Sequence, residues 1–187
     1  MGGTATDLLA RFHRNRQGIA AVEFAVIVPV MLLLYIGASD VALAITAHRK
    51  LQSTANATAD LIAQDSATTK ADLTAELDIA RALMQPLDAA KVKIVLSSIL
   101  IDAKGKAVVD WSSAVNGAVA RRKGTEFILP DSLANQPSRS FVVVEASYLY
   151  TPLGGFGFTH GIEMSKSAYF APRNTSGNAG IQCSDCS

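Results

Sequence analysis

Residues 17–47 read QGIAAVEFAVIVPVMLLLYIGASDVALAITA, and this stretch decides the fold. Sixteen uncharged residues separate Glu23 from Asp40, and these two acids are the only charged residues among the twenty-nine from Ile19 to Ala47. A helix rises about 1.5 Å per residue and needs about twenty apolar residues to cross a bilayer. The sequence therefore predicts a membrane-spanning helix over residues 19–47.

Glu23 lies one turn inside the apolar run, where a charged side chain is costly. One interpretation is that its carboxylate lies at headgroup depth and is simply solvated. The other interpretation starts from the spacing between Gly18 and Glu23. If the peptide bond after Gly18 is cut, Ile19 carries a new α-amine that is positively charged near neutral pH. A carboxylate one turn away, on the same helix or on a neighbouring one, can neutralise this amine.

The segment Gly-Ile-Ala-Ala-Val-Glu-Phe-Ala that begins at Gly18 resembles the processing site of type IV prepilins. That site has a basic leader ending in glycine, an apolar helix, glutamate at the fifth mature position and an aromatic residue at the sixth. Pro29, Gly37 and Asp40 follow in the helix, and a tyrosine-bearing segment occupies residues 142–153. With these features the chain is similar to the TadE-like family of minor pilins of the tight-adherence (Tad) secretion and pilus system.

This resemblance implies a processing step, an assembly site and a set of partners. A prepilin peptidase would cut between Gly18 and Ile19, and Glu23 and Phe24 would serve in assembly. The implied partners are the membrane, the peptidase, other pilin subunits and the Tad assembly machinery. At 187 residues the chain is longer than a major Tad pilin, which favours a minor component.

The first eighteen residues predict the orientation of the span. Arg11, Arg14 and Arg16 stand against a single acid, Asp7, and a cationic flank is retained in the cytoplasm. Residues 1–18 are therefore expected to form a cytoplasmic leader. The expected protein crosses the bacterial inner membrane once, with its C-terminal domain periplasmic or extracellular, and is either incorporated in the pilus or only primes it. A cleaved secretory signal is disfavoured, because the apolar run is too long for one.

Pro29 and Gly37 lie within the predicted span and predict a helix kink. Proline removes one backbone hydrogen bond and clashes with the preceding turn, and neighbouring groups usually re-satisfy the freed carbonyl in a membrane helix. The kink is either harmless or a point of local melting that lets the helix adapt when it moves from bilayer to filament. The sequence leaves both readings open.

Helical periodicity continues beyond the span and then restarts. A weak apolar stripe predicts that the first helix runs on: Leu51, Ala55, Thr58 and Ile62. After a polar break at residues 65–70, a second helix is expected, capped by Thr69 or Ser66 and ended by Pro86. Its stripe is clearer: Leu73, Leu77, Ala80, Met84 and Leu87. Stripes of this kind are typical of helices that pack on a core.

From residue 91 the sequence changes to the period of strands. The expected strands are residues 91–101, 107–112, 141–150 and 162–170. Four strands after two helices predict an α+β, pilin-like fold over residues 48–173, with a small antiparallel sheet packed on the helical part. Residues 121–123, which are all basic, are expected to lie in a solvated loop. Residues 153–161 are expected to form a mobile or membrane-facing hairpin tip.

Cys183 and Cys186 lie in a tail, residues 174–187, that is rich in serine, glycine and asparagine and is expected to be flexible. In an oxidising compartment a disulfide between them is the simplest expectation, and so short a loop would clamp only the tail. Half a zinc site and a thioredoxin-like redox pair are the alternatives. A zinc site needs two more ligands, and a redox pair normally lies at a helix start within a βαβ unit.

Composition sets the remaining limits. A net charge of +1 provides no strong field to hold nucleic acid, and about 140 residues beyond the span suffice for one compact domain. The sequence contains no recognisable catalytic pattern, so we expect a protein that is not an enzyme and that has no cofactor and no metal.

Two functions are then favoured. The first is a minor pilin or pseudopilin that is processed after Gly18 and takes part in Tad-type pilus assembly, adhesion or secretion. The second is an uncleaved, signal-anchored envelope protein with an extracytoplasmic binding domain. An anchored thiol oxidoreductase that uses Cys183 is a third hypothesis.

Overall fold

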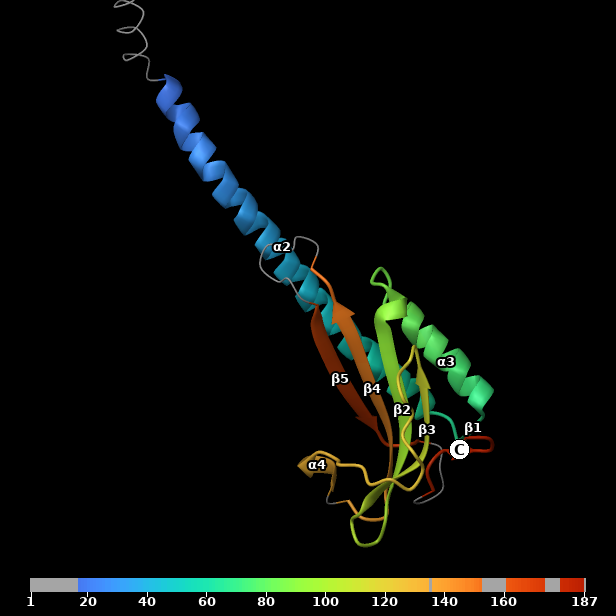
Figure 1. Ribbon diagram of the computed structural model, residues 1–187. Coiled ribbons are helices and arrows are strands. Elements are labelled where there is room, and N and C mark those ends of the chain that lie inside the picture. The colour runs from blue at the N-terminus through green and yellow to red at the C-terminus, as the bar shows by residue number, and fades with distance from the viewer. Residues whose placement is uncertain (1–16, 135, 153–160, 174–178, 187) are drawn as a thin grey trace, which may run out of the picture. The chain divides into compact units, whose positions relative to one another are not determined.

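The computed structural model describes residues 17–134, 136–152, 161–173 and 179–186 (Figure 1). The chain divides into two compact units, residues 1–43 with 152–159 and residues 44–151 with 160–187. Residues 1–16 of the predicted leader and residues 153–160 of the predicted hairpin tip lie outside the described residues. The predictions for both segments stay predictions.

The first described element is α2 (Gln17–Ile62), a single helix of 46 residues. It continues through Pro29 and Gly37 without a break in its helical assignment. Beyond the apolar run its inward stripe is fully buried, with no exposed surface on Ala47, Leu51, Ala55, Ala59 and Ile62. The predicted continuation of the first helix is therefore confirmed.

The second helix, α3 (Lys70–Ala82), is capped as the sequence predicts. The Thr69 side chain accepts from the backbone N–H of Asp72 while the Asp72 carboxylate accepts from the backbone N–H of Thr69, which is a capping box. The helix ends at Ala82, earlier than the predicted end at Pro86. The Lys50 ammonium of α2 donates to the carbonyl oxygens of Leu83 and Gln85 and so satisfies groups that the next helical turn would have used.

Four strands form the main sheet, in the order β3-β2-β4-β5, and every pair is antiparallel. Their bounds are β2 (Val92–Ile101), β3 (Ala107–Val115), β4 (Ser140–Tyr150) and β5 (Ile162–Phe170). The predicted α+β class and its four-stranded antiparallel sheet are confirmed. Short elements complete the described fold: β1 (Ala67–Thr68), the 3-10 helix η1 (Ala89–Lys91), α4 (Asp131–Ala134) and β6 (Gln182–Cys183).

The main core lies between one face of the sheet and the buried sides of α2 and α3. Alternate residues of β4 point into it, as the period of two requires: Val142, Val144, Ala146, Tyr148 and Tyr150. A second core lies on the other face, and the sequence analysis did not predict it. Segment 127–134 covers that face, where Phe127 and Leu129 pack with Ile99, Val109 and Val143.

A β-bulge in β3 places residues two apart in the sequence, Val109 and Trp111, on opposite faces of the sheet. The register between β2 and β3 shifts after Ser98, so that Ser98 pairs with Trp111 and Ile99 pairs with Val109, and Asp110 is the extra residue. One extra residue reverses the face of every side chain beyond it. Val109 therefore points into the second core, and Trp111 points into the main one.

The described part of the tail is bound to the domain, which differs from the expected flexible segment. β6 pairs in parallel with β1, and Ile181 is completely buried in the main core. The Trp111 indole N–H donates to the carbonyl oxygen of Ile181 at 2.7 Å. A Cβ atom at Gly180 would lie 3.0 Å from both Ser98 Oγ and Leu100 Cδ2, so the tail passes close over the sheet. The sequence did not predict this contact, because Ile181 is an isolated aliphatic residue among mostly polar ones and forms no periodic pattern.

Candidate assembly helix

Gly18 and Ile19, the predicted processing site, lie in the first turn of α2. Both residues are exposed, and a Cβ atom built at Gly18 meets nothing within 4 Å. The first four backbone N–H groups of a helix have no partner within the helix. The peptide bond after Gly18 therefore lies in an exposed end turn of α2 and has no close side-chain neighbour among the described residues.

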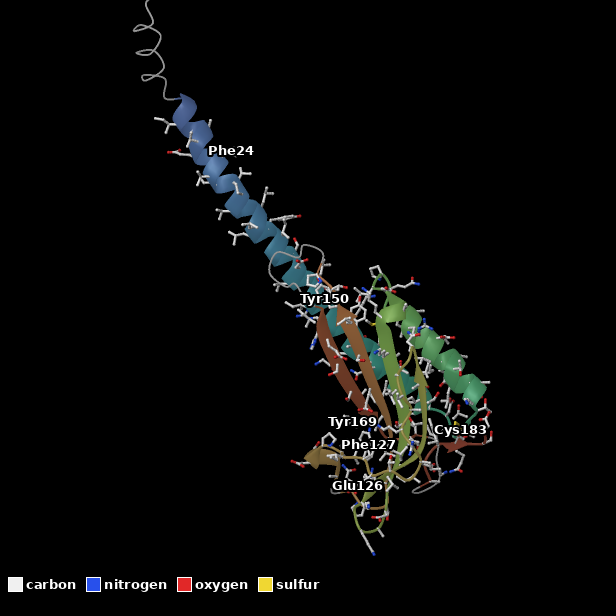
Figure 2. The ribbon with its side chains drawn as sticks, in the orientation of Figure 1. Phe24, Glu126, Phe127, Tyr150, Tyr169 and Cys183 are labelled. Carbon is white, nitrogen blue, oxygen red and sulfur yellow. A yellow bond between two sulfur atoms is a disulfide. The ribbon has the colours of Figure 1, made fainter. Side chains whose placement is uncertain are left out.

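Glu23 lies four residues after Ile19 on α2, so that both side chains fall on the same helix face. The Glu23 side chain is exposed, and the neighbouring Phe24 has 70% of its surface exposed. Figure 2 labels Phe24 on the N-terminal part of α2. The structure thus places a carboxylate and an aromatic ring on the outside of this segment, one turn from the predicted new amino terminus.

The apolar residues between Ile19 and Leu43 are exposed around the helix. The exposed fraction is 58% for Ile19, 64% for Leu34 and 50% for Val41. An exposed apolar surface of this extent marks a contact with a membrane or with other protein. Among the described residues, α2 is the one helix long and apolar enough to cross a membrane. It is compatible with a single-pass membrane anchor.

Gly37 lies in the same exposed part of α2 as Pro29. A Cβ atom at Gly37 also meets nothing within 4 Å, so the glycine is not required there by a neighbouring side chain. Because the helical assignment runs through both residues, the chain accommodates Pro29 inside a helix. The predicted kink and its role in adaptation stay predictions.

Comparison with protein families identifies this segment. Residues 18–60 match the family model of TadE-like proteins. Its N-terminal helix is similar to that of TadE-like proteins. The matched range begins at Gly18 and covers nearly all of α2, and the four-stranded sheet lies outside it. Neither the curated proteins nor the solved structures include a match to this chain.

Cys183 and Cys186 are joined by a disulfide, with their Cα atoms 5.5 Å apart. The Asp185 carboxylate between them accepts from the backbone N–H of Lys70 at 2.7 Å. Ligand atoms of Cys183, Asp185 and Cys186 lie within 4.8 Å of one another. Since the two sulfur atoms are bonded to each other, they are not available as thiolate ligands in this state. Figure 2 locates Cys183 in the C-terminal segment.

A carboxylate cluster outside the TadE-like helix was not predicted. Burial, then the charge of Asp65 and a hydrogen bond with it, and last the charge of Asp72 together raise the pKa of Glu76 to about 7. The spacing of four residues between Asp72 and Glu76 was a visible signal, because it places both acids on one face of a helix. The proximity of Asp65 depends on the fold.

Burial also raises the pKa of Tyr148.

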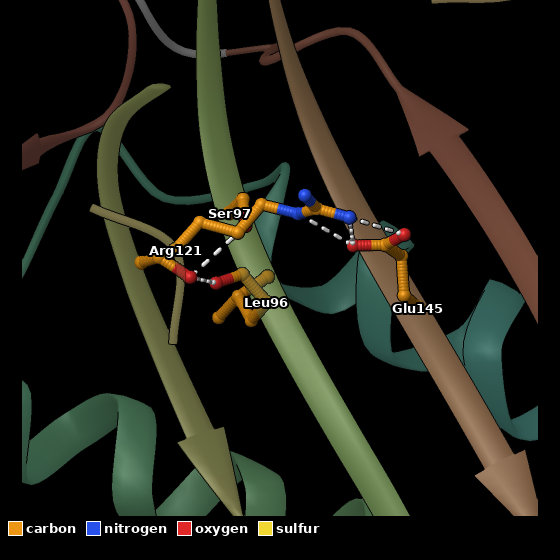
Figure 3. Close-up of polar contacts among 5 residues, drawn as sticks. Leu96, Ser97, Arg121 and Glu145 are labelled. Carbon is orange, nitrogen blue, oxygen red and sulfur yellow. Dashed lines mark hydrogen bonds and ion pairs between the residues drawn. The ribbon is translucent and has the colours of Figure 1, made fainter. Parts of the chain in front are cut away.

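Arg121 lies in an exposed loop, as expected for residues 121–123, and the structure adds a pairing with the sheet that was not predicted (Figure 3). Its Nε and Nη2 atoms donate to the two carboxylate oxygens of Glu145 at 2.9 and 2.8 Å. Its guanidinium also lies over the Phe127 ring, 4.8 Å from the ring centroid. Lys123 pairs with the bulged Asp110 at 3.0 Å. Two of the three basic residues therefore hold the loop on the domain.

Proposed function

We propose that this chain is a minor pilin or pseudopilin of a Tad-type pilus system and that it acts by assembly, without catalysis. One observation carries the proposal: the TadE-like match begins at Gly18 and coincides with a helix whose apolar residues are exposed. An exposed apolar helix requires a membrane or other helices around it. A pilin uses both in turn, first as an anchor and then as a subunit contact.

Processing after Gly18 is the first proposed step. A prepilin peptidase removes residues 1–18 and leaves Ile19 with a free α-amine, which is cationic near neutral pH. In an assembled filament the Glu23 carboxylate neutralises the Ile19 amine of an adjacent subunit. This pairing offsets the cost of an uncompensated charge in an apolar environment. It thereby favours one stagger between neighbouring helices over others.

The second part of the proposal concerns location and partners. The N-terminus lies in the cytoplasm and the sheet domain outside the inner membrane, as the three leader arginines favour. The domain caps or primes the filament, and its partners are other pilin subunits and the Tad assembly machinery. Its compact core between α2 and the sheet supports this role, because a filament subunit needs a rigid body on its assembly helix.

The decisive experiment is the intact mass and N-terminal sequence of the membrane-extracted protein, from cells with and without the prepilin peptidase. We expect a start at Ile19 only where the peptidase is present. The variant Gly18→Val should abolish processing, and Gly37→Val is its matched control. Both glycines lie in α2 with open space around them, so neither substitution meets a clash in the described chain.

A chain that keeps residues 1–18 in both strains would contradict the processing step. It would favour the alternative of a signal-anchored envelope protein with an extracytoplasmic binding domain. A chain of the Gly37→Val variant that also escapes processing would show that the helix as a whole, rather than the site at Gly18, had been disturbed.

A further inference from the structure

The C-terminal segment 180–186 is attached to the domain by two different kinds of contact. The first is a buried anchor, formed by Ile181 in the main core and by the hydrogen bond from Trp111 to its carbonyl oxygen. The second lies beyond Ile181, where Gln182, Ser184 and Asp185 are exposed and the two cysteines are half-buried against the main core. It consists of the short β1–β6 ladder and of the loop between Cys183 and Cys186.

The loop closed by the disulfide reaches the start of a helix that lies far away in the sequence. Asp185 accepts a hydrogen bond from the backbone N–H of Lys70, the first residue of α3. The capping box of Thr69 and Asp72 satisfies a different N–H group at the same end. A carboxylate is favourable at this position, because the N-terminus of a helix carries partial positive charge. Asp185 is thus a second cap of α3, supplied by the tail.

The disulfide closes the loop that carries Asp185. Asp185 is exposed and belongs to no regular element, and its two flanking cysteines restrict the loop to a few conformations. Without the S–S bond, the loop between Cys183 and Cys186 is no longer closed and can sample more conformations. The conformational entropy of the open loop then opposes the single hydrogen bond to Lys70.

The bond is also within reach of small reagents. Cys183 lines an open hollow of about 440 Å³ together with Thr68, Thr69 and Ser184. Cys186 lines a second hollow of about 250 Å³ on the side of Lys70 and Ser113. Each of the two sulfur-bearing residues therefore faces its own opening.

We propose that segment 182–186 is a redox-sensitive latch: the Cys183–Cys186 disulfide keeps Asp185 on the N-terminus of α3, and its reduction releases this end of the tail while Ile181 stays anchored. The reductant is a dithiol. One thiolate attacks a sulfur of the disulfide to form a mixed disulfide, and the second thiolate then displaces the other cysteine. The dithiol is oxidised to its cyclic disulfide, and the two cysteines take up two electrons and two protons.

Hydrogen exchange on the full-length protein in detergent micelles tests this proposal, with dithiothreitol as the dithiol. Reduction is verified by a mass increase of two hydrogen atoms. We expect the Lys70 amide to exchange about fivefold faster after reduction, the order expected when one helix cap is lost. The amides of Gln182 and Ser184, which donate to Ser66 and Thr68, should also exchange faster. The fluorescence of Trp111 should be unchanged, because the anchor at Ile181 remains.

Two variants separate the cap from the disulfide. Asp185→Ala keeps the disulfide and should show the faster Lys70 exchange before any reductant is added, with no further change on reduction. Asp185→Asn keeps an acceptor oxygen and should behave like the unaltered protein. Unchanged Lys70 exchange after verified reduction would overturn the proposal. A loss of the native Trp111 fluorescence on reduction would overturn it too, since the whole tail would then have left.

Discussion

Glu76 is a residue whose protonation is coupled to folding. Its carboxyl lies close to Asp65, three residues after the end of α2, and to Asp72, one turn earlier in α3. Burial and these two charges raise its pKa from 4.5 to about 7. Asp72 is held in this place by the capping box with Thr69, so the cluster cannot easily disperse. The fold therefore favours the proton on Glu76.

An acid whose pKa is raised in the folded state binds its proton more tightly there than in the unfolded chain. Glu76 therefore stabilises the domain below about pH 4.5, and this contribution is lost as the pH rises through about 7. We expect the free energy of unfolding to decrease less steeply between pH 4.5 and pH 7 in Glu76→Gln than in the unaltered protein. Urea unfolding of the micellar protein, followed by the fluorescence of the single tryptophan, measures it.

Glu163→Gln, an exposed acid on β5, is the control for this measurement and should leave the pH dependence as it is. A Glu76→Gln protein that loses stability between pH 4.5 and pH 7 as steeply as the unaltered chain would contradict the assignment to Glu76.

At the scale of elements, periodicity was enough to predict the helices and the sheet. Leu51, Ala55 and Ile62 repeat at helical spacing, and the even-numbered residues of β4 share one face, because regular elements bury one side. Contacts between distant segments left no such pattern. The bulge at Asp110 and the burial of Ile181 each depend on a partner elsewhere in the chain. The same holds for α3, whose early end involves Lys50 of another helix.

The candidate site divides in the same way. Gly18, Glu23 and Phe24 were predicted from their spacing along the chain, and their roles in processing and assembly stay predictions. Their exposure on α2 came only from the structure. Arg121 lies in an exposed loop as expected, but its pairing was not predicted, because its partners, Glu145 and Phe127, are set by the sheet and by the second core. A local run of basic residues carries no information about such partners.

Segment 127–134, which covers the second core, is held in part by the contact of Arg121 with Phe127. The contribution of Arg121 to the stability of the domain can therefore be measured. Arg121→Ala removes a bidentate pair with a half-exposed Glu145 and a contact with the Phe127 ring. We expect the free energy of unfolding to fall by about 1 kcal/mol. A double-mutant cycle with Glu145→Ala should give a coupling energy of about 0.5–1 kcal/mol that decreases at high salt.

Arg122→Ala is the matched control, because Arg122 is the exposed neighbour in the same loop. It should change the free energy of unfolding by less than about 0.5 kcal/mol. Equal effects of the two substitutions would mean that the loss of positive charge, rather than the Glu145 pair, weakens the domain.

For the whole molecule, the energies of the TadE-like helix decide what Glu23 can do. Fully burying one large aliphatic side chain is worth about 1.5–3 kcal/mol, and many such side chains between Ile19 and Leu43 are exposed. A charged residue near the bilayer centre costs about 2.5–3.5 kcal/mol, and less toward the edge. The apolar run therefore outweighs Glu23 several times over. Membrane insertion does not depend on this carboxylate, whereas the choice of a neighbouring subunit can.

Glu23→Gln should accordingly leave the protein in the membrane fraction and leave cleavage after Gly18 intact. Incorporation of the variant with other pilin subunits should fall by about tenfold or more, because the Ile19 amine of the neighbouring subunit then lacks a counter-charge. The measurement is the ratio of the processed chain in sheared pili to that in membranes. Glu126→Gln, an exposed acid of the sheet domain, should keep the unaltered ratio. If Glu23→Gln assembles as well as this control, the amine is neutralised by another group and Glu23 is only a solvated acid at the membrane edge. If the Glu23→Gln variant leaves the membrane fraction, the conclusion that the apolar side chains of the helix outweigh the charge of Glu23 in membrane insertion is wrong.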